Sequence, residues 1–566
     1  DKLTQSLDAA FYELSLASNV NVTSNPNLPF VGASFGNQIY LGKFQPPANG
    51  GAIWPGDVLM FGTRQINGQT VIIDKSGNAT TVTDETTSQW SAKSALVNGR
   101  LWKDRKLYTR TPGGTTLRVF TDLGTEFSDA TNGLQKYVAT SMTSLPDKQK
   151  VIQFAAGGDL TKPGPDLRPT ENRSTIMGDV INSAPAAIEY NWLDVKDLIS
   201  SYPRLAAVGG NRFRLLLVGT NQGWLHAFGE VTKKTSVIDA SNVTREIVTG
   251  DVEELWSFMP TDFLANLNYI TVANNPHRFM VDGTPAIYHL DLPPLTGGSG
   301  NGVVDATERA VAVIGLRKGG RSYYALDVHN PFTPALKWSM VPDEAASLPA
   351  SRIVSGGPTL GTVTDILGKW GFSTCTPAFG RIQFNNVIRD AVFLGGGFSV
   401  PEIEANFSNT KLGRSVMAID VYSGEVLAAS DLTDGSIGGA TVGPVSAGII
   451  PFEFVLNSGM AQRAYFLDYR GGLWSWGSKA VASSAPYVDF RQDSSQITSW
   501  KIRKVFQDDD AVGKGARYTT LPAPFRVGSF PGVGKTGSAA PTAAGIAIVS
   551  GDRNNPVDRE YDASTP

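Results

Sequence analysis

One short pattern recurs along the chain: an apolar run, a tight turn rich in Asn and Gly, and a second apolar run. Its first copy is Leu215–Phe228, where Asn221, Gln222 and Gly223 separate the two runs. Asn and Gly accept the positive φ angles of tight turns, so the pattern predicts a β-hairpin. Further copies lie at Val311–Asp327, at Arg389–Gly397 completed by Ser415–Asp420, and at Arg463–Trp476. A recurring hairpin predicts a repeat fold.

Segments on both sides of the hairpins extend the repeat to four strands. A small residue and a Pro precede an apolar run ahead of each hairpin, and Pro suits the first position of a strand, where its missing N–H does no damage. These openings are Ser183–Ile188, Gly283–Ile287, Cys375–Phe379, Val442–Val445 and Leu521–Phe525. After the hairpins come strands that carry Trp, at Glu254–Phe258, Ala335–Trp338 and Ser499–Ile502.

Four-stranded units in series are typical of a β-propeller, whose radial closure protects the strand edges. We therefore predict an all-β fold, a β-propeller of about seven blades. The repeats are longer than the roughly 40–45 residues of a compact blade, which predicts inserted loops at Lys233–Asp251, Leu292–Glu308 and Pro401–Gly413. A two-sheet sandwich is the alternative, but it would not explain repeated units of this kind.

The residues before the repeats are less regular. Lys2–Leu16 has apolar residues at helical spacing, while Gln38–Phe44, Asp57–Gly62 and Thr70–Asp74 predict strands and Trp90–Arg110 predicts a partly helical segment. We assign residues 1–30 to a helix and linker that follow a missing domain, and residues 31–566 to the propeller.

Composition narrows the function classes. The 566 residues carry a net charge of −3, which gives no electrostatic footprint for nucleic acid. The sequence contains no run of about 18 apolar residues, so no transmembrane helix is expected. The single cysteine, Cys375, excludes an internal disulfide and is expected to be a small buried apolar residue.

From about Gln38 to Asp558 the chain resembles the C-terminal propeller of the PilY family, the tip adhesins and biogenesis factors of bacterial type IV pili. The resemblance rests on six motifs in order: Arg173–Pro185, Val218–Phe228, His277–Pro285, Gly319–Asp327, Leu367–Pro377 and Arg463–Trp474. It implies a non-enzymatic module that supports pilus biogenesis, retraction, twitching motility and adhesion. The implied location is extracellular, at the pilus tip on the outer-membrane surface. The implied partners are minor pilins of the tip complex, and host or abiotic surfaces; a scaffold that binds only minor pilins is a further alternative.

The loop Gly297–Glu308 has the layout of an EF-hand-like calcium site. Its predicted ligands are Ser299, Asn301, the backbone carbonyl of Val303, Asp305 and Glu308, with Gly302 at the sharp turn. Gly297 stands where an Asp is expected, so only two carboxylates remain. The PilY family carries an Asp-rich calcium loop in what looks like the corresponding region, which implies calcium as the cofactor here. A solvated Gly-rich loop without metal is the open alternative.

A rival function is that of a quinoprotein dehydrogenase. Ala325–Asp327 and Ala418–Leu427 resemble the repeat in which Ala-x-Asp, Gly and Trp lock neighbouring blades of those enzymes, which hold pyrroloquinoline quinone with calcium. The lone Cys375 excludes the vicinal disulfide that many of them carry. His226 and His289 lie within apolar strands and are interpreted as hydrogen-bonded structural residues, so we predict no enzyme activity.

Overall fold

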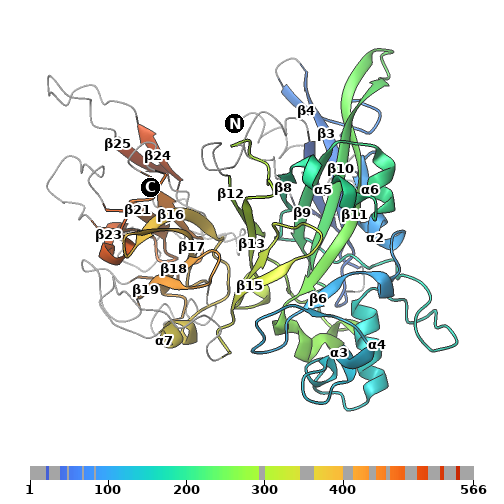
Figure 1. Ribbon diagram of the computed structural model, residues 1–566, viewed down its shortest axis with the longest axis horizontal. Coiled ribbons are helices and arrows are strands. Elements are labelled where there is room, and N and C mark those ends of the chain that lie inside the picture. The colour runs from blue at the N-terminus through green and yellow to red at the C-terminus, as the bar shows by residue number, and fades with distance from the viewer. Residues whose placement is uncertain are drawn as a thin grey trace, which may run out of the picture. The chain divides into compact units, whose positions relative to one another are not determined.

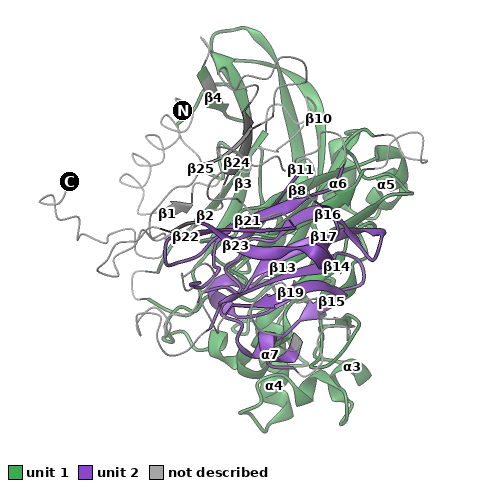
Figure 2. Cartoon of the chain, turned by 90° about the vertical axis from the view of Figure 1, so that its left-hand side faces the viewer, with its two compact units in different colours: residues 1–314, 324–337 green, residues 315–323, 338–566 purple. Residues whose placement is uncertain are grey.

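A computed structural model of the protein describes residues 21–23, 38–47, 50–66, 69–81, 84–291, 300–344, 363–398, 412–432, 442–453, 459–478, 494–507, 523–527 and 543–547. Within these ranges the chain is mostly β, and its strands form several open sheets (Figure 1). It divides into two compact units, Asp1–Ile314 with Tyr324–Lys337 and Gly315–Tyr323 with Trp338–Pro566 (Figure 2). No described helix is long and apolar enough to span a membrane. The helix predicted at Lys2–Leu16 lies outside the described residues.

The first sheet has the order β1-β2-β3-β4, and β5 pairs with β3. Its strands are β1 (Asn21–Thr23), β2 (Gln38–Phe44), β3 (Gly56–Ile66), β4 (Gln69–Ile73) and β5 (Trp90–Ser91). All three strands predicted in this region are confirmed. Ile39 and Leu41 pack on one face of β2 while Tyr40 packs on the other, so the strand is buried on both sides. Burial on both faces explains why its sequence does not alternate between apolar and polar residues.

The second sheet contains the first predicted hairpin. Its order is β7-β6-β11-β10-β9-β8, with β6 (Leu107–Thr109), β7 (Arg118–Val119), β8 (Ala186–Tyr190), β9 (Arg212–Gly219), β10 (Leu225–Ile238) and β11 (Thr244–Met259). Leu225 pairs with Gly219 across the turn. Gly223 in that turn has a φ of 92°, the left-handed region that favours glycine. The side chains of Trp224 and His226 are fully buried, as expected for residues of a strand interior.

One predicted insertion has a different structure from the one expected. The segment Lys233–Asp251 was predicted to be a loop, but β10 and β11 continue through most of it and pair from Lys233 with Thr249 to Ile238 with Thr244. Figure 1 shows the two strands running on together as a ribbon. The prediction was wrong because most of the segment is polar, although its Thr, Val and Ile residues favour strand geometry and Ile247 among them is buried.

Short helices connect the strands of this region. The segment Trp90–Arg110 is partly helical, as predicted, and holds α2 (Ala92–Val97) and a 3₁₀ turn at Trp102–Asp104. Ser91 caps α2 by accepting a hydrogen bond from the backbone N–H of Ser94. The other helices are α3 (Gly124–Ser128), α4 (Leu145–Ala155), α5 (Trp192–Ile199), α6 (Pro203–Val208) and α7 (Val363–Gly368).

Three further sheets each follow strands in chain order, β12 to β15, β16 to β19 and β20 to β23, as predicted for the repeat. The first comprises β12 (Ala286–Leu290), β13 (Arg309–Gly315), β14 (Tyr323–Asp327) and β15 (Ala335–Met340). The second comprises β16 (Ala378–Phe384), β17 (Val387–Gly395), β18 (Ser415–Asp420) and β19 (Val426–Asp431). The third comprises β20 (Ile449–Phe452), β21 (Arg463–Leu467), β22 (Gly472–Gly477) and β23 (Lys501–Gln507). A separate pair is β24 (Ala523–Val527) with β25 (Ala543–Ala547).

One predicted opening strand is displaced along the chain. Val442–Val445 was expected to begin a strand after its Pro, yet β20 begins only at Ile449. The backbone N–H of Val445 donates to the carbonyl of Gly413, and the N–H of Gly443 donates to the Asp468 carboxylate at 2.9 Å. Turn and loop partners therefore take the hydrogen bonds that a strand would have used.

Tryptophans on two strands, β11 and β15, reach the turn of the sheet that follows in the chain. The indole N–H of Trp256 on β11 donates to the carbonyl of Pro331, after β14, at 2.8 Å. The indole N–H of Trp338 on β15 donates to the carbonyl of Val421, after β18, at 2.9 Å. Gly424 lies against Trp338 so closely that a Cβ there would sit 2.6 Å from the Trp338 Cβ. Each of two successive sheets thus makes the same type of contact with the sheet that follows it. The Ala-x-Asp and Gly motifs predicted a contact of this type between repeats.

Candidate metal centre

The candidate centre lies where β12 ends and β13 begins. These strands pair antiparallel, and their last printed pair joins Leu290 with Arg309. Continued by one residue beyond that last pair, the register would place Asp291 opposite Glu308. His289 precedes Asp291 by two residues and so shares its face of the strand. The pairing therefore places an imidazole and two carboxylates on one face, although the loop separates Glu308 from the other two in sequence.

The three side chains converge. His289 Nε2 lies 2.8 Å from Glu308 Oε2, and one potential ligand atom from each of His289, Asp291 and Glu308 falls within 4.8 Å of the others. The Glu308 side chain is 0% exposed and that of His289 is 13% exposed. Burying a carboxylate costs free energy unless a cation or hydrogen-bond donors compensate. The arrangement can therefore bind a divalent cation as well as form the ion pair between His289 and Glu308.

Backbone amides of the loop hold both carboxylates. The N–H of Asp305 donates to Glu308 Oε2 at 3.1 Å, and the N–H of Gly302 donates to Asp291 Oδ2 at 2.9 Å. Gly302 has a φ of 77°, so the sharp turn predicted at this position is present. The other carboxylate oxygen, Asp291 Oδ1, is shielded from solvent and has no hydrogen-bond partner among the described residues.

The loop is anchored on β8. Val304 forms a parallel bridge with Tyr190, the N–H of Val304 donates to the Glu189 carbonyl at 2.9 Å, and the N–H of Asn191 donates back to Val304. Asn191 also donates through its side chain to Asp305 Oδ1 at 2.7 Å. These contacts fix the backbone that presents the carboxylate-binding amides.

The predicted calcium ligands occupy different environments. Ser299 lies outside the described residues, and Asn301 is exposed and accepts a hydrogen bond from the N–H of Val303 at 2.9 Å. Asp305 turns its Oδ1 to Asn191, so of the two predicted carboxylate ligands Glu308 joins the converging cluster and Asp305 does not. The cluster partners His289 and Asp291 were not predicted, although a His-x-Asp pair at the end of a strand was a usable signal. The five-residue calcium set stays a prediction.

A second polar cluster lies inside the second sheet, where its side chains are buried and hydrogen-bonded to one another. His226 Nδ1 lies 2.9 Å from Glu254 Oε1 and 3.0 Å from the Ser257 hydroxyl, and Arg105 binds the same carboxylate through two hydrogen bonds of 2.6 and 2.7 Å. His226 and Ser257 are 0% exposed, so no substrate reaches them from solvent. Glu254 and Ser257 also meet the same ring nitrogen, whereas a catalytic triad uses both nitrogens of its His.

Burial and charge set the protonation of this cluster. Burial lowers the pKa of His226, more than the neighbouring Glu254 raises it. Burial alone would raise the pKa of Glu254, but the Arg105 guanidinium and His226 hold that pKa well below its usual range. The interpretation of His226 as a hydrogen-bonded structural residue is confirmed.

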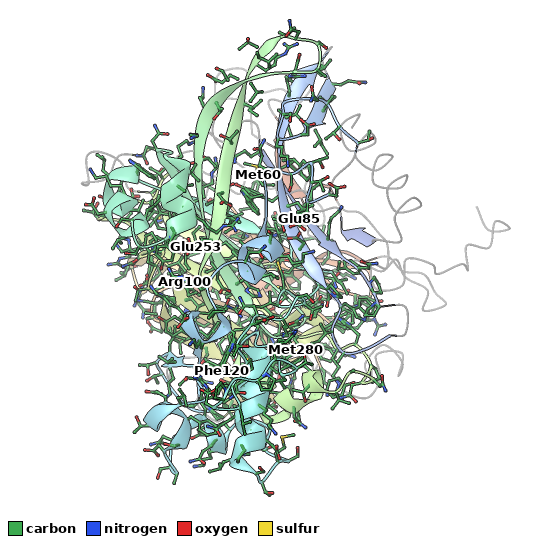
Figure 3. All side chains as sticks on the ribbon, turned by 90° about the vertical axis from the view of Figure 1, so that its right-hand side faces the viewer. Met60, Glu85, Arg100, Phe120, Glu253 and Met280 are labelled. Atoms are coloured by element: carbon green, nitrogen blue, oxygen red, sulfur yellow. The ribbon has the colours of Figure 1, made fainter. Side chains whose placement is uncertain are left out.

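A neighbouring ion pair joins Arg100 and Glu253, both labelled in Figure 3, with Arg100 Nε 3.3 Å from Glu253 Oε1.

Comparison with known proteins identifies relatives of this chain. No family model matches the chain. The type IV pilus biogenesis factor PilY1 of Pseudomonas aeruginosa strain PAK is 24% identical over 461 residues, covering 76% of this chain and 33% of the relative; the strain PAO1 protein gives the same values. A PilY1 homolog of Xylella fastidiosa strain Temecula1 is 28% identical over 232 residues, covering 39% of this chain and 16% of that protein.

A solved structure is also similar, the C-terminal domain of Pseudomonas aeruginosa PilY1. It has 20% sequence identity and a TM-score of 0.33, and the match covers 55% of this chain and 49% of that one. The chain spans about a third of the length of the Pseudomonas relatives. The resemblance stated from the sequence motifs is confirmed: the chain is a homologue of the type IV pilus biogenesis factors named PilY1.

Proposed function

We propose that this chain is a β-propeller module of a type IV pilus biogenesis protein and that it acts outside the cell, at the pilus tip. The observation that carries the proposal is the similarity to PilY1 proteins over 76% of the chain. The chain spans about a third of the length of those relatives, so the proposal gives it a part in the pilus role that their names describe.

The contacts between successive sheets support the propeller part of the proposal. Trp256 on β11 and Trp338 on the edge strand β15 each donate a hydrogen bond to a carbonyl at the turn of the next sheet. A propeller requires such a repeated contact because each blade packs against the next. A sheet sandwich would instead bury two inner faces against each other. The number of blades, about seven, is part of the proposal.

Within this proposal the module presents loops on a rigid scaffold, where binding residues commonly lie. Its partners are minor pilins of the tip complex, and host or abiotic surfaces are the targets of adhesion. The loop set of Ser299, Asn301, Val303, Asp305 and Glu308 would bind calcium and so couple adhesion or retraction to that ion.

Shearing of pili from the encoding bacterium tests the location. An antibody against residues 84–291 is expected to detect the protein in the sheared pilus fraction of the parent strain and not in that of a strain lacking the major pilin. Equal signal in both fractions would contradict association with the pilus. A dye-linked oxidation assay with added pyrroloquinoline quinone tests the dehydrogenase alternative in the same preparations, and activity above that of the protein without quinone would overturn the non-enzymatic assignment.

A further inference from the structure

We propose that His289, Asp291 and Glu308 bind one divalent transition-metal cation of the zinc class. The proposal rests on the geometry of the β12–β13 junction and is independent of the pilus role. It names two ligands, His289 and Asp291, that the predicted calcium set does not contain.

The strand register brings the ligands together without any rearrangement of the backbone. His289 and Asp291 are two residues apart at the end of β12, and Glu308 immediately precedes β13, whose first residue pairs with the last residue of β12. The three ligand atoms already lie within 4.8 Å of one another. Ligand atoms in a tetrahedral zinc site lie about 3.3 Å apart, given bonds of about 2.0 Å. Rotations of the side chains alone could therefore close the site on an ion.

The electrostatics of the cluster call for a cation. Two carboxylates converge in a site where the Glu308 side chain is 0% exposed, and their repulsion is larger there than in water. Among the described residues no group donates a hydrogen bond to Asp291 Oδ1, an atom that is shielded from solvent. An acceptor of this kind costs free energy if nothing binds it. A divalent ion would bind that oxygen and balance both negative charges.

The ligand types favour a transition metal over calcium. An imidazole nitrogen is a common ligand of Zn²⁺, whereas Ca²⁺ takes six to eight oxygen ligands. Three protein ligands with a fourth position for water suit zinc, and they are too few for calcium. The backbone N–H groups of Gly302 and Asp305 already bind the carboxylates from outside, the role that a second shell has around a metal. Glu308 also belongs to the predicted calcium set, so the two ions compete for this side chain.

The test uses the whole chain, freed of metal with a chelator, and measures binding of Zn²⁺, Co²⁺ and Ca²⁺ in parallel. The wild-type chain is expected to bind one Zn²⁺ by calorimetry and to give visible absorption bands with Co²⁺. His289→Gln and Asp291→Asn are each expected to weaken Zn²⁺ binding at least tenfold and to remove the Co²⁺ bands. Glu246→Gln is the matched control, because this exposed carboxylate pairs with Lys234 and is not part of the cluster, and it is expected to leave Zn²⁺ affinity within about twofold.

Circular dichroism and thermal melting show whether each variant folds. If His289→Gln does not fold, the conservative Asp291→Asn variant still tests the proposal. Zn²⁺ binding that is equal in the wild-type chain and both ligand variants would overturn the proposal. So would Ca²⁺ binding that requires Asp305 and is unaffected by His289→Gln. Because these readouts involve only the purified chain, they fail or succeed separately from the pilus function.

Discussion

Removing the charge of Glu254 is expected to destabilise the unit that contains the second sheet by about 3–5 kcal/mol, the cost of leaving a buried charge without its partner. Arg105 donates to both Glu254 oxygens, at 2.6 and 2.7 Å, and the two side chains are 2% and 8% exposed. In Glu254→Gln one of the two acceptors becomes an NH₂ group that faces the guanidinium. The variant therefore loses the ion pair and one charged hydrogen bond, while Arg105 stays buried.

The matched control is Glu246→Gln on the same strand. Glu246 lies 2.8 Å from Lys234, but the two side chains are 61% and 70% exposed. A pair this exposed contributes about 0–1 kcal/mol. Urea unfolding followed by Trp fluorescence and circular dichroism at pH 7 gives both free energies of unfolding. Equal losses in the two variants would refute the argument that burial determines the cost.

The same pair makes a prediction about pH. The folded-state pKa of Glu254 is lower than the value of about 4.3 in an unfolded chain, so its contribution is fully present above that pH and is lost as pH falls toward the folded pKa. The difference in stability between the wild type and Glu254→Gln is therefore expected to shrink between about pH 4 and pH 2. A difference that stays constant over this range would show that the carboxylate charge is not the cause.

Three further changes probe other buried groups. Trp338→Phe removes the donor to the Val421 carbonyl and is expected to lower the free energy of unfolding by about 1–3 kcal/mol, measured by urea titration. An unchanged free energy of unfolding would mean that the contact between sheets is dispensable. Burial raises the pKa of the Cys375 thiol to about 12. Iodoacetamide is therefore expected to leave Cys375 unmodified in the native chain and to alkylate it in urea, as measured by mass spectrometry. Rapid alkylation of the native chain would contradict this burial. Burial raises the pKa of Asp57 to about 6, above the unfolded value of about 3.9, so stability is expected to fall as pH rises from about 4 to 6. Asp57→Asn should remove that slope, measured by thermal melting across this pH range, and an unchanged slope would assign it to other groups.

The sequence predicted the hairpins well because turn chemistry is local. Gly223 must adopt a positive φ, and the apolar runs beside it pair in the register that such a turn imposes. The ribbon at Lys233–Asp251 was missed because most of its residues are polar, and a hydrophobic pattern does not report the pairing of its two strands with each other. The displaced start of β20 has the same origin, since loop partners for Val445 and Gly443 come from distant parts of the chain.

The candidate centre was half predicted for a related reason. The calcium pattern counts residues along one loop, so it found Glu308 and the turn at Gly302. It could not find His289 and Asp291, because they meet Glu308 through the register of two strands. His289 is hydrogen-bonded, as predicted, but its partner is the buried carboxylate of the predicted site.

We propose above that this module serves type IV pilus biogenesis. The most direct measurement is the number of surface pili per cell, counted by electron microscopy, in a strain whose gene lacks the segment for residues 38–507. An immunoblot shows that the remaining protein is still made. We expect few or no surface pili, and restoration of their number when the full gene is returned. A normal number of pili in the deletion strain would contradict the claim.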